Sequence, residues 1–185
     1  MHMGGPRFSL EREVVMHRIA IFIDGGYIDK VLQTEFGSAR INYEALSREI
    51  STRIHADAEI LRTYYYHCLP YHSNPPTQEE SERYAARKSF MDALNRLPRF
   101  EIRRGRLVRR GPDIRGQYFF EQKMVDVLLS IDLVLLSAKG HVTDVAVVGG
   151  DADFVPAIET AKREGVSVWL FHGNRPHEEL WMIAD

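Results

Sequence analysis

The predicted fold rests on two segments, HRIAIFIDGG at residues 17–26 and DVAVVGGDADF at residues 144–154. Each segment is an apolar, β-branched run that ends in glycines and aspartates, which is the pattern of a buried parallel strand and its turn. Helical spacing and strand-like runs alternate through the rest of the chain, with helices expected over 27–36, 43–53, 78–97 and 121–138. This alternation predicts an α/β fold built on a doubly wound, mostly parallel sheet.

Composition excludes several classes of protein. The 185 residues are 44% apolar and 27% charged, which fits one globular domain and excludes a disordered chain. Cys68 is the single cysteine, so an intramolecular disulfide and a multi-cysteine zinc site are excluded. No run approaches the roughly 20 apolar residues of a membrane span, and the N-terminus lacks the pattern of a signal peptide. We expect a cytoplasmic protein that does not bind membranes, with a flexible arm at residues 1–16 and one domain at 17–185.

Four aspartates occupy positions that this topology brings together. Asp24 ends the first strand, Asp151 and Asp153 follow the strand that ends at 148, and Asp126 lies early in the apolar helix. Parallel strands gather their carboxyl ends at one edge of a sheet, where ligands bind. Several carboxylates within a few ångströms repel one another unless a cation neutralises them, and oxygen ligands suit Mg²⁺ or Mn²⁺. The pattern therefore indicates a metal site.

Each acid also has a structural interpretation. Asp153 fits the N-cap of the following helix, Asp151 fits an Asx turn, and Asp24 fits the turn before two glycines. Asp126 is harder to explain in this way, because an unpaired acid in so apolar a helix costs several kcal/mol to bury. Lys123 lies three residues earlier on the expected helix, where it can pair with the acids, reach a phosphate or remain a surface lysine.

The sequence favours a structural role for Asp132 and for a set of two histidines and one cysteine. Asp132 lies about 240° around the helix from Asp126 and is expected to face away from it. His67, Cys68 and His72 resemble a zinc cluster, but neighbouring side chains on a strand point to opposite faces and no fourth ligand is evident.

Residues 99–115 form an arginine-rich segment. It holds seven arginines against two acids, a local charge of +5 in a chain whose formal net charge is −2. Arginines beside aromatic side chains favour contact with single-stranded nucleic acid, through phosphates and stacked bases. The predicted substrate-binding residues are Lys123, Arg103, Arg104, Arg106, Arg109 and Arg110.

Three blocks resemble the NYN domain family, a branch of the PIN-like ribonuclease superfamily. They are FIDGGY at 22–27, QKMVDVLLSIDL at 122–133 and VVGGDADFVPAIETAKREGVSV at 147–168. The resemblance implies a three-layer α/β/α PIN-like fold around a mostly parallel sheet, with the four aspartates as its metal-binding and catalytic residues. Lys123 would be the lysine that precedes the helix acid. The chain departs from many members at Tyr27, where they have asparagine, and at Gly149, where they have serine.

Taken together, the residues and the resemblance predict an Mg²⁺- or Mn²⁺-dependent endoribonuclease that hydrolyses phosphodiester bonds of RNA. Single-stranded RNA is the expected substrate, and a homodimer is a possible assembly. No residue identifies a contact to the 2′-hydroxyl, so DNA stays open as a substrate. The alternative is a catalytically inactive RNA-binding or protein-interaction module of PIN-like fold. A haloacid-dehalogenase-type phosphatase is disfavoured by Gly26, which stands where that chemistry needs an acid.

Overall fold

The computed structural model describes residues 16–112 and 118–185. Five strands form a parallel sheet in the order β3-β2-β1-β6-β7. Their bounds are β1 Arg18–Asp24, β2 Glu59–His67, β3 Phe100–Arg104, β6 Asp144–Val148 and β7 Ser167–Phe171. The flexible arm predicted for residues 1–16 lies outside the described residues, apart from Met16.

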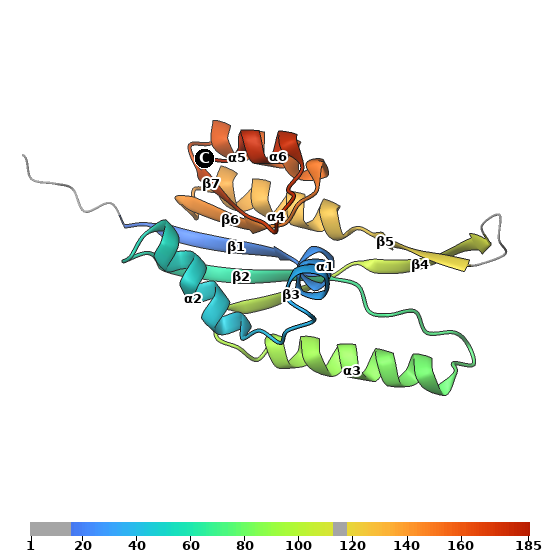
Figure 1. Cartoon of the computed structure of the whole chain (residues 1–185). Helices are drawn as coiled ribbons and strands as arrows, with labels where there is room; N and C mark the ends of the chain where they lie inside the picture. Colours follow the sequence, from blue (N-terminus) through green and yellow to red (C-terminus); the bar gives the residue numbers. More distant parts are fainter. Residues whose placement is uncertain (1–15, 113–117) are drawn as a thin grey trace, which may run out of the picture.

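Helices cover both faces of this sheet and confirm the three-layer prediction (Figure 1). They are α1 Gly25–Glu35, α2 Tyr43–Ile54, α3 Gln78–Leu94, α4 Val125–Ala138, α5 Val155–Arg163 and α6 Glu178–Ile183, with a short 3-10 turn, η1, at Ala152–Phe154. Among the described residues, no helix is both long and apolar enough to span a bilayer.

The central strand β1 supplies side chains to two hydrophobic cores. Ala20 and Phe22 pack with Leu129 of α4 on one face of the sheet. Ile21 and Ile23 pack on the other face, against residues of α1, α2 and α3. All five residues from 19 to 23 are fully buried. A strand buried on both faces reads as a continuous apolar run, which is why the sequence pattern was informative here.

Local signals place the helix ends as predicted. Asn42 caps α2 by accepting a 3.0 Å hydrogen bond from the amide of Ala45. Thr77 and Glu80 form the expected reciprocal capping box at the start of α3. Gly165 follows α5 with φ of +81°, the left-handed conformation that favours glycine at this position.

The helix predicted from residue 121 begins later. Residues Tyr118–Lys123 form β5, which pairs antiparallel with β4, Arg106–Pro112. The chain turns at Met124, with φ of 75°, before α4 begins. The prediction that Lys123 lies on this helix is therefore wrong. The loop predicted around Gly111 and Pro112 is the end of β4, and residues 113–117 lie outside the described chain.

Although its sequence is apolar almost all round, α4 is buried on one face only. Its inner face is buried at Leu129 and Leu133, but Val127, Ile131 and Leu135 are 58%, 49% and 47% exposed. The β4–β5 hairpin is a separate two-stranded sheet that extends away from the end of the main sheet (Figure 1).

Candidate metal centre and nucleic-acid interface

The four aspartates lie at the carboxyl-terminal edge of β1 and β6. Ile23 pairs with Val148 in the parallel register, so Asp24 follows β1 where the turn holding Asp151 and Asp153 follows β6. Asp126 occupies the first turn of α4, which contacts both β1 and η1. Segments that are far apart in the sequence thus bring four carboxylates to one edge.

Asp24 shapes the turn into α1. Its Oδ1 accepts hydrogen bonds from the amides of Gly26 and Tyr27, at 2.9 and 3.1 Å, and so caps the helix. Burial raises the pKa of the Asp24 carboxyl, and the nearby Asp126 adds to this rise, while the two amide bonds oppose it. The structural interpretation of Asp24 is correct, but it uses only one of the two carboxylate oxygens.

Asp151 forms the Asx turn considered from the sequence. Its Oδ1 accepts a 3.0 Å hydrogen bond from the amide of Asp153. Asp153 itself does not cap α5, because Phe154 occupies that position and makes no side-chain cap. Both aspartates are exposed, so their remaining oxygens face solvent at the edge of the sheet.

Asp126 has no cationic side chain within ion-pair distance among the described residues. Burial raises the pKa of its carboxyl, and the negative charges of Asp151 and Asp153 raise it further. Lys123, the partner considered from the sequence, pairs instead with Glu121 on its own strand. The edge therefore concentrates negative charge that the described side chains leave uncompensated.

This donor set fits a hard divalent cation. All four side chains offer carboxylate oxygens, which Mg²⁺ and Mn²⁺ prefer. The oxygens are spaced too widely to form a cage of protein ligands alone. Mg²⁺ is commonly held in this way, through one or two carboxylates together with waters and phosphate oxygens.

A tighter cluster lies at the opposite end of the strands. Within the described residues, His17, His55 and Asp144 are the group whose ligand atoms all lie within 4.8 Å of one another. The buried Asp144 carboxylate lies 3.0 Å from His17 Nδ1 and 3.3 Å from His55 Nε2, and it accepts a hydrogen bond from Trp169. The two imidazole rings stack with centroids 3.5 Å apart. Because the two rings stack, the lone pairs of their ring nitrogens lie side by side. This arrangement suits two contacts to the one buried carboxylate of Asp144 better than the binding of one shared ion.

The predicted substrate-binding arginines fall into two groups. Arg103 and Arg104 lie on β3 and bind carboxylates of the protein, with Arg103 Nε 2.8 Å from Asp132 and Arg104 3.1 Å from Asp92. Asp132 also accepts a 2.9 Å hydrogen bond from the hydroxyl of Tyr66, which confirms its expected structural role.

Arg106, Arg109 and Arg110 lie on the projecting strand β4. The guanidinium of Arg109 stacks 3.7 Å from the centroid of Tyr118, and Arg110 pairs with Glu121 at 2.6 Å. Residues 118–120 are all aromatic and 46–53% exposed. The hairpin thus presents cationic and aromatic groups together, next to the edge where β5 leads into α4.

Two residues at the edge, Gln122 and His67, were not assigned to it from the sequence. The amide of Gln122 lies over Gly26 and beside Asp24. His67 lies near enough to influence the charge of Asp24 and approaches Asp29 at 3.2 Å. Gln122 opens the second block that resembles the family, but its contact with Gly26 joins β5 to α1 and could not be predicted from the sequence.

The family comparison covers nearly the whole chain. The model of the NYN domain matches residues 18–184. The chain belongs to the NYN domain family. NYN domains are part of the PIN-like superfamily, so the chain has a nuclease-type fold. Searches of the curated proteins and of the solved structures give no significant match to this NYN domain.

Proposed function

We propose that this NYN domain is an endoribonuclease that hydrolyses single-stranded RNA with Mg²⁺ or Mn²⁺ bound at Asp24, Asp126, Asp151 and Asp153. The observation that supports it most is the gathering of these carboxylates at one strand edge without a compensating cation among the described side chains. Family membership adds that NYN domains are usually ribonucleases.

Each residue has a role that follows from its position. When bound, the divalent ion polarises the scissile phosphate and activates water for attack. Asp24 is fixed by the amides of Gly26 and Tyr27, so its free oxygen is held in a constant position. Asp126, on the helix, and Asp151 and Asp153, on the turn, would supply the other carboxylate ligands.

The hairpin supplies the grip on the strand in this proposal. Arg106 and Arg109 would contact phosphates, and the exposed rings of Tyr118 and Phe119 would stack with bases. Lys123 lies where the hairpin meets the acids, and it would contact the phosphate next to the reacting one. Arg103 and Arg104 would add positive potential from β3 while they hold Asp132 and Asp92 in place.

The test is cleavage of an end-labelled single-stranded RNA, with a DNA strand of the same sequence in parallel. We expect cleavage of RNA in Mn²⁺, and none in EDTA or with Asp126→Asn or Asp151→Asn. The matched control is Asp57→Asn, which removes an exposed acid outside the edge. Cleavage that persists both in EDTA and in the two edge variants would contradict the proposal, and binding without cleavage would favour the inactive RNA-binding module.

A further inference from the structure

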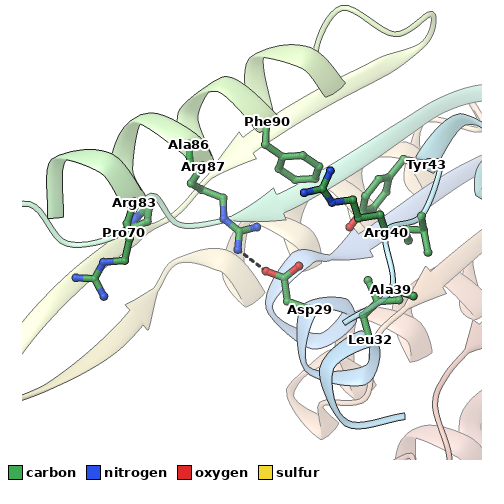
Figure 2. Close-up of a pocket in the computed structure, with 11 residues that line it drawn as sticks. Asp29, Leu32, Ala39, Arg40, Tyr43, Pro70, Arg83, Ala86, Arg87 and Phe90 are labelled. Carbon is green, nitrogen blue, oxygen red and sulfur yellow. Dashed lines mark hydrogen bonds and ion pairs between the residues drawn. The ribbon is translucent and has the colours of Figure 1, made fainter. Parts of the chain in front are cut away.

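A pocket lies beside α1, outside the acidic edge. It has a volume of about 710 Å³ and is lined by α1, residues 39–41, the start of α2, the loop at Pro70 and α3. Figure 2 shows three arginine side chains around it, Arg83 and Arg87 from α3 and Arg40 from the segment before α2. Its volume lies within the range of small-molecule binding pockets. We call it the arginine pocket.

The arginine pocket carries an excess of positive charge. Its one acidic residue, Asp29, accepts a 2.6 Å hydrogen bond from Arg87 and also contacts His67. Burial alone would raise the pKa of Asp29, but these two partners hold it below its ordinary value. The charge of Asp29 is therefore matched inside the protein, and the charges of Arg40 and Arg83 remain.

Neither of these two arginines is held firmly by an acid. Arg83 approaches Glu79 at 3.9 Å, but both side chains are mostly exposed, and such a pair contributes little. Arg40 is exposed and has no acidic partner among the residues that the structure describes. Both guanidinium groups are therefore available to an anionic ligand, and phosphate matches their forked geometry.

Aromatic rings form the wall between these charges. Tyr43 and Phe90 both line the pocket, and each packs edge-on against the buried ring of Tyr65, with centroids 5.4 and 5.9 Å apart. Arg87 lies over the Phe90 ring at 5.7 Å. These contacts fix the rings in place. A rigid aromatic wall next to unpaired guanidinium groups is the combination that binds a base together with its phosphate.

The pocket is also connected to the acidic edge. Asp24 caps the first turn of α1, and Asp29 lies five residues later, about 7–8 Å along the helix axis. His67 lies between the two, because it contacts Asp29 and its ring packs against Gly25, the residue after Asp24. A ligand in the pocket would therefore lie beside a strand bound at the edge.

We propose that the arginine pocket binds a stretch of the RNA strand that flanks the bond at the acidic edge, with one phosphate on Arg40, another on Arg83 at the far end of the pocket, and a base against Phe90. The proposal rests on the proposed function for the identity of the strand. A free mononucleotide has the same chemistry, so the experiment includes it as a separate ligand.

The test measures binding in EDTA, where metal-dependent cleavage does not occur. The affinity of a fluorescent single-stranded RNA is followed by anisotropy at several salt concentrations, for the wild type and for Arg40→Ala combined with Arg83→Ala. We expect the double variant to bind at least about tenfold more weakly, and its salt slope to fall by about 1.4, the value for two lost phosphate contacts on a single strand.

The matched control is Arg53→Ala combined with Arg163→Ala, which removes the same charge from exposed sites outside the pocket. It should keep the wild-type affinity and salt slope to within about twofold. All four substituted arginines are exposed, so we expect both double variants to fold. Their melting temperatures verify this.

Equal affinity of the pocket variant and the wild type would overturn the proposal, as would a wild type that binds no RNA. Binding of uridine monophosphate that depends on Arg40 and Arg83, without binding of RNA, would overturn the strand as the ligand and assign the pocket to a free nucleotide. A wild type that binds RNA through the pocket but never cleaves it would overturn the proposed function and support the pocket.

Discussion

The ring of Tyr27 lies directly against the backbone of Gly150. A Cβ atom at position 150 would fall within 3.0 Å of three ring carbons of Tyr27. The hydroxyl of the same tyrosine accepts a 2.9 Å hydrogen bond from the amide of Gly173. Tyr27, which stands where many NYN domains have asparagine, thus ties α1 to the turns after β6 and β7. Its ring packs next to the acidic edge.

Gly150→Ala should therefore destabilise the fold by about 1–3 kcal/mol, because the methyl group has to displace the ring. Urea unfolding measures this loss. Gly111→Ala is the control, since a Cβ there meets nothing within 4 Å. In a Tyr27→Ala background the cost of Gly150→Ala should largely disappear, and equal costs in both backgrounds would refute the packing argument.

Tyr66→Phe should destabilise the protein by about 1–2 kcal/mol, because it removes the hydroxyl that donates to Asp132 from a fully buried side chain. Tyr64 is a matched control on the same strand, and its hydroxyl makes no hydrogen bond within the described part of the chain. Tyr64→Phe should change the unfolding free energy by less than about 0.5 kcal/mol. Similar losses for the two variants would contradict the role given to Asp132.

Asp126→Asn should raise the melting temperature of the metal-free protein, because it removes a carboxylate that Asp151 and Asp153 repel. Mn²⁺ at a hundred times its Kd should stabilise the wild type by about 2.7 kcal/mol, or about 5–10 °C for a domain of this size. The variant should lose most of this shift, and Asp57→Asn should keep it. Differential scanning fluorimetry with EDTA and with Mn²⁺ gives both values, and a full shift in Asp126→Asn would count against this residue as a ligand.

The gain in stability that Asp126→Asn gives the metal-free protein should also depend on pH. Burial and the charges of Asp151 and Asp153 raise the pKa of Asp126 above its ordinary value of 3.8, so the folded protein binds this proton more tightly than the unfolded chain. The stabilisation from that proton is complete below the unfolded pKa and is lost as pH rises through the folded pKa. The variant should thus be more stable than the wild type at pH 7, and the two should converge as pH falls towards 4. Urea unfolding in EDTA across this range tests the sign, which a constant difference would contradict.

The sequence predicted secondary structure correctly where the signal was local or where a strand is buried on both faces. The run 19–23 predicted β1, and Thr77 with Glu80 predicted the start of α3. The acidic edge followed from topology alone, because parallel strands with similar ends were expected to be neighbours. Asp132 was also assigned correctly from its angle on the helix.

The errors came from contacts between distant segments. Residues 121–123 were expected to form the first turn of the apolar helix, but pairing with β4 makes them part of a strand, and Lys123 is therefore not on the helix. Arg103 and Arg104 looked free until the fold brought Asp132 and Asp92 to them. The arginine pocket was equally hidden, since its walls come from four separate segments.

The strand order has a consequence for how the chain is made. β1 lies between β2 and β6, so one of its edges is paired only after residues 144–148 have been synthesised. Until then the growing chain exposes an unpaired, wholly apolar strand at residues 19–23, the kind of edge that recruits other chains. A fragment that stops after α4 should therefore aggregate even though it contains three of the five strands. The last quarter of the chain thus covers the apolar edge of β1 and also completes the acidic edge.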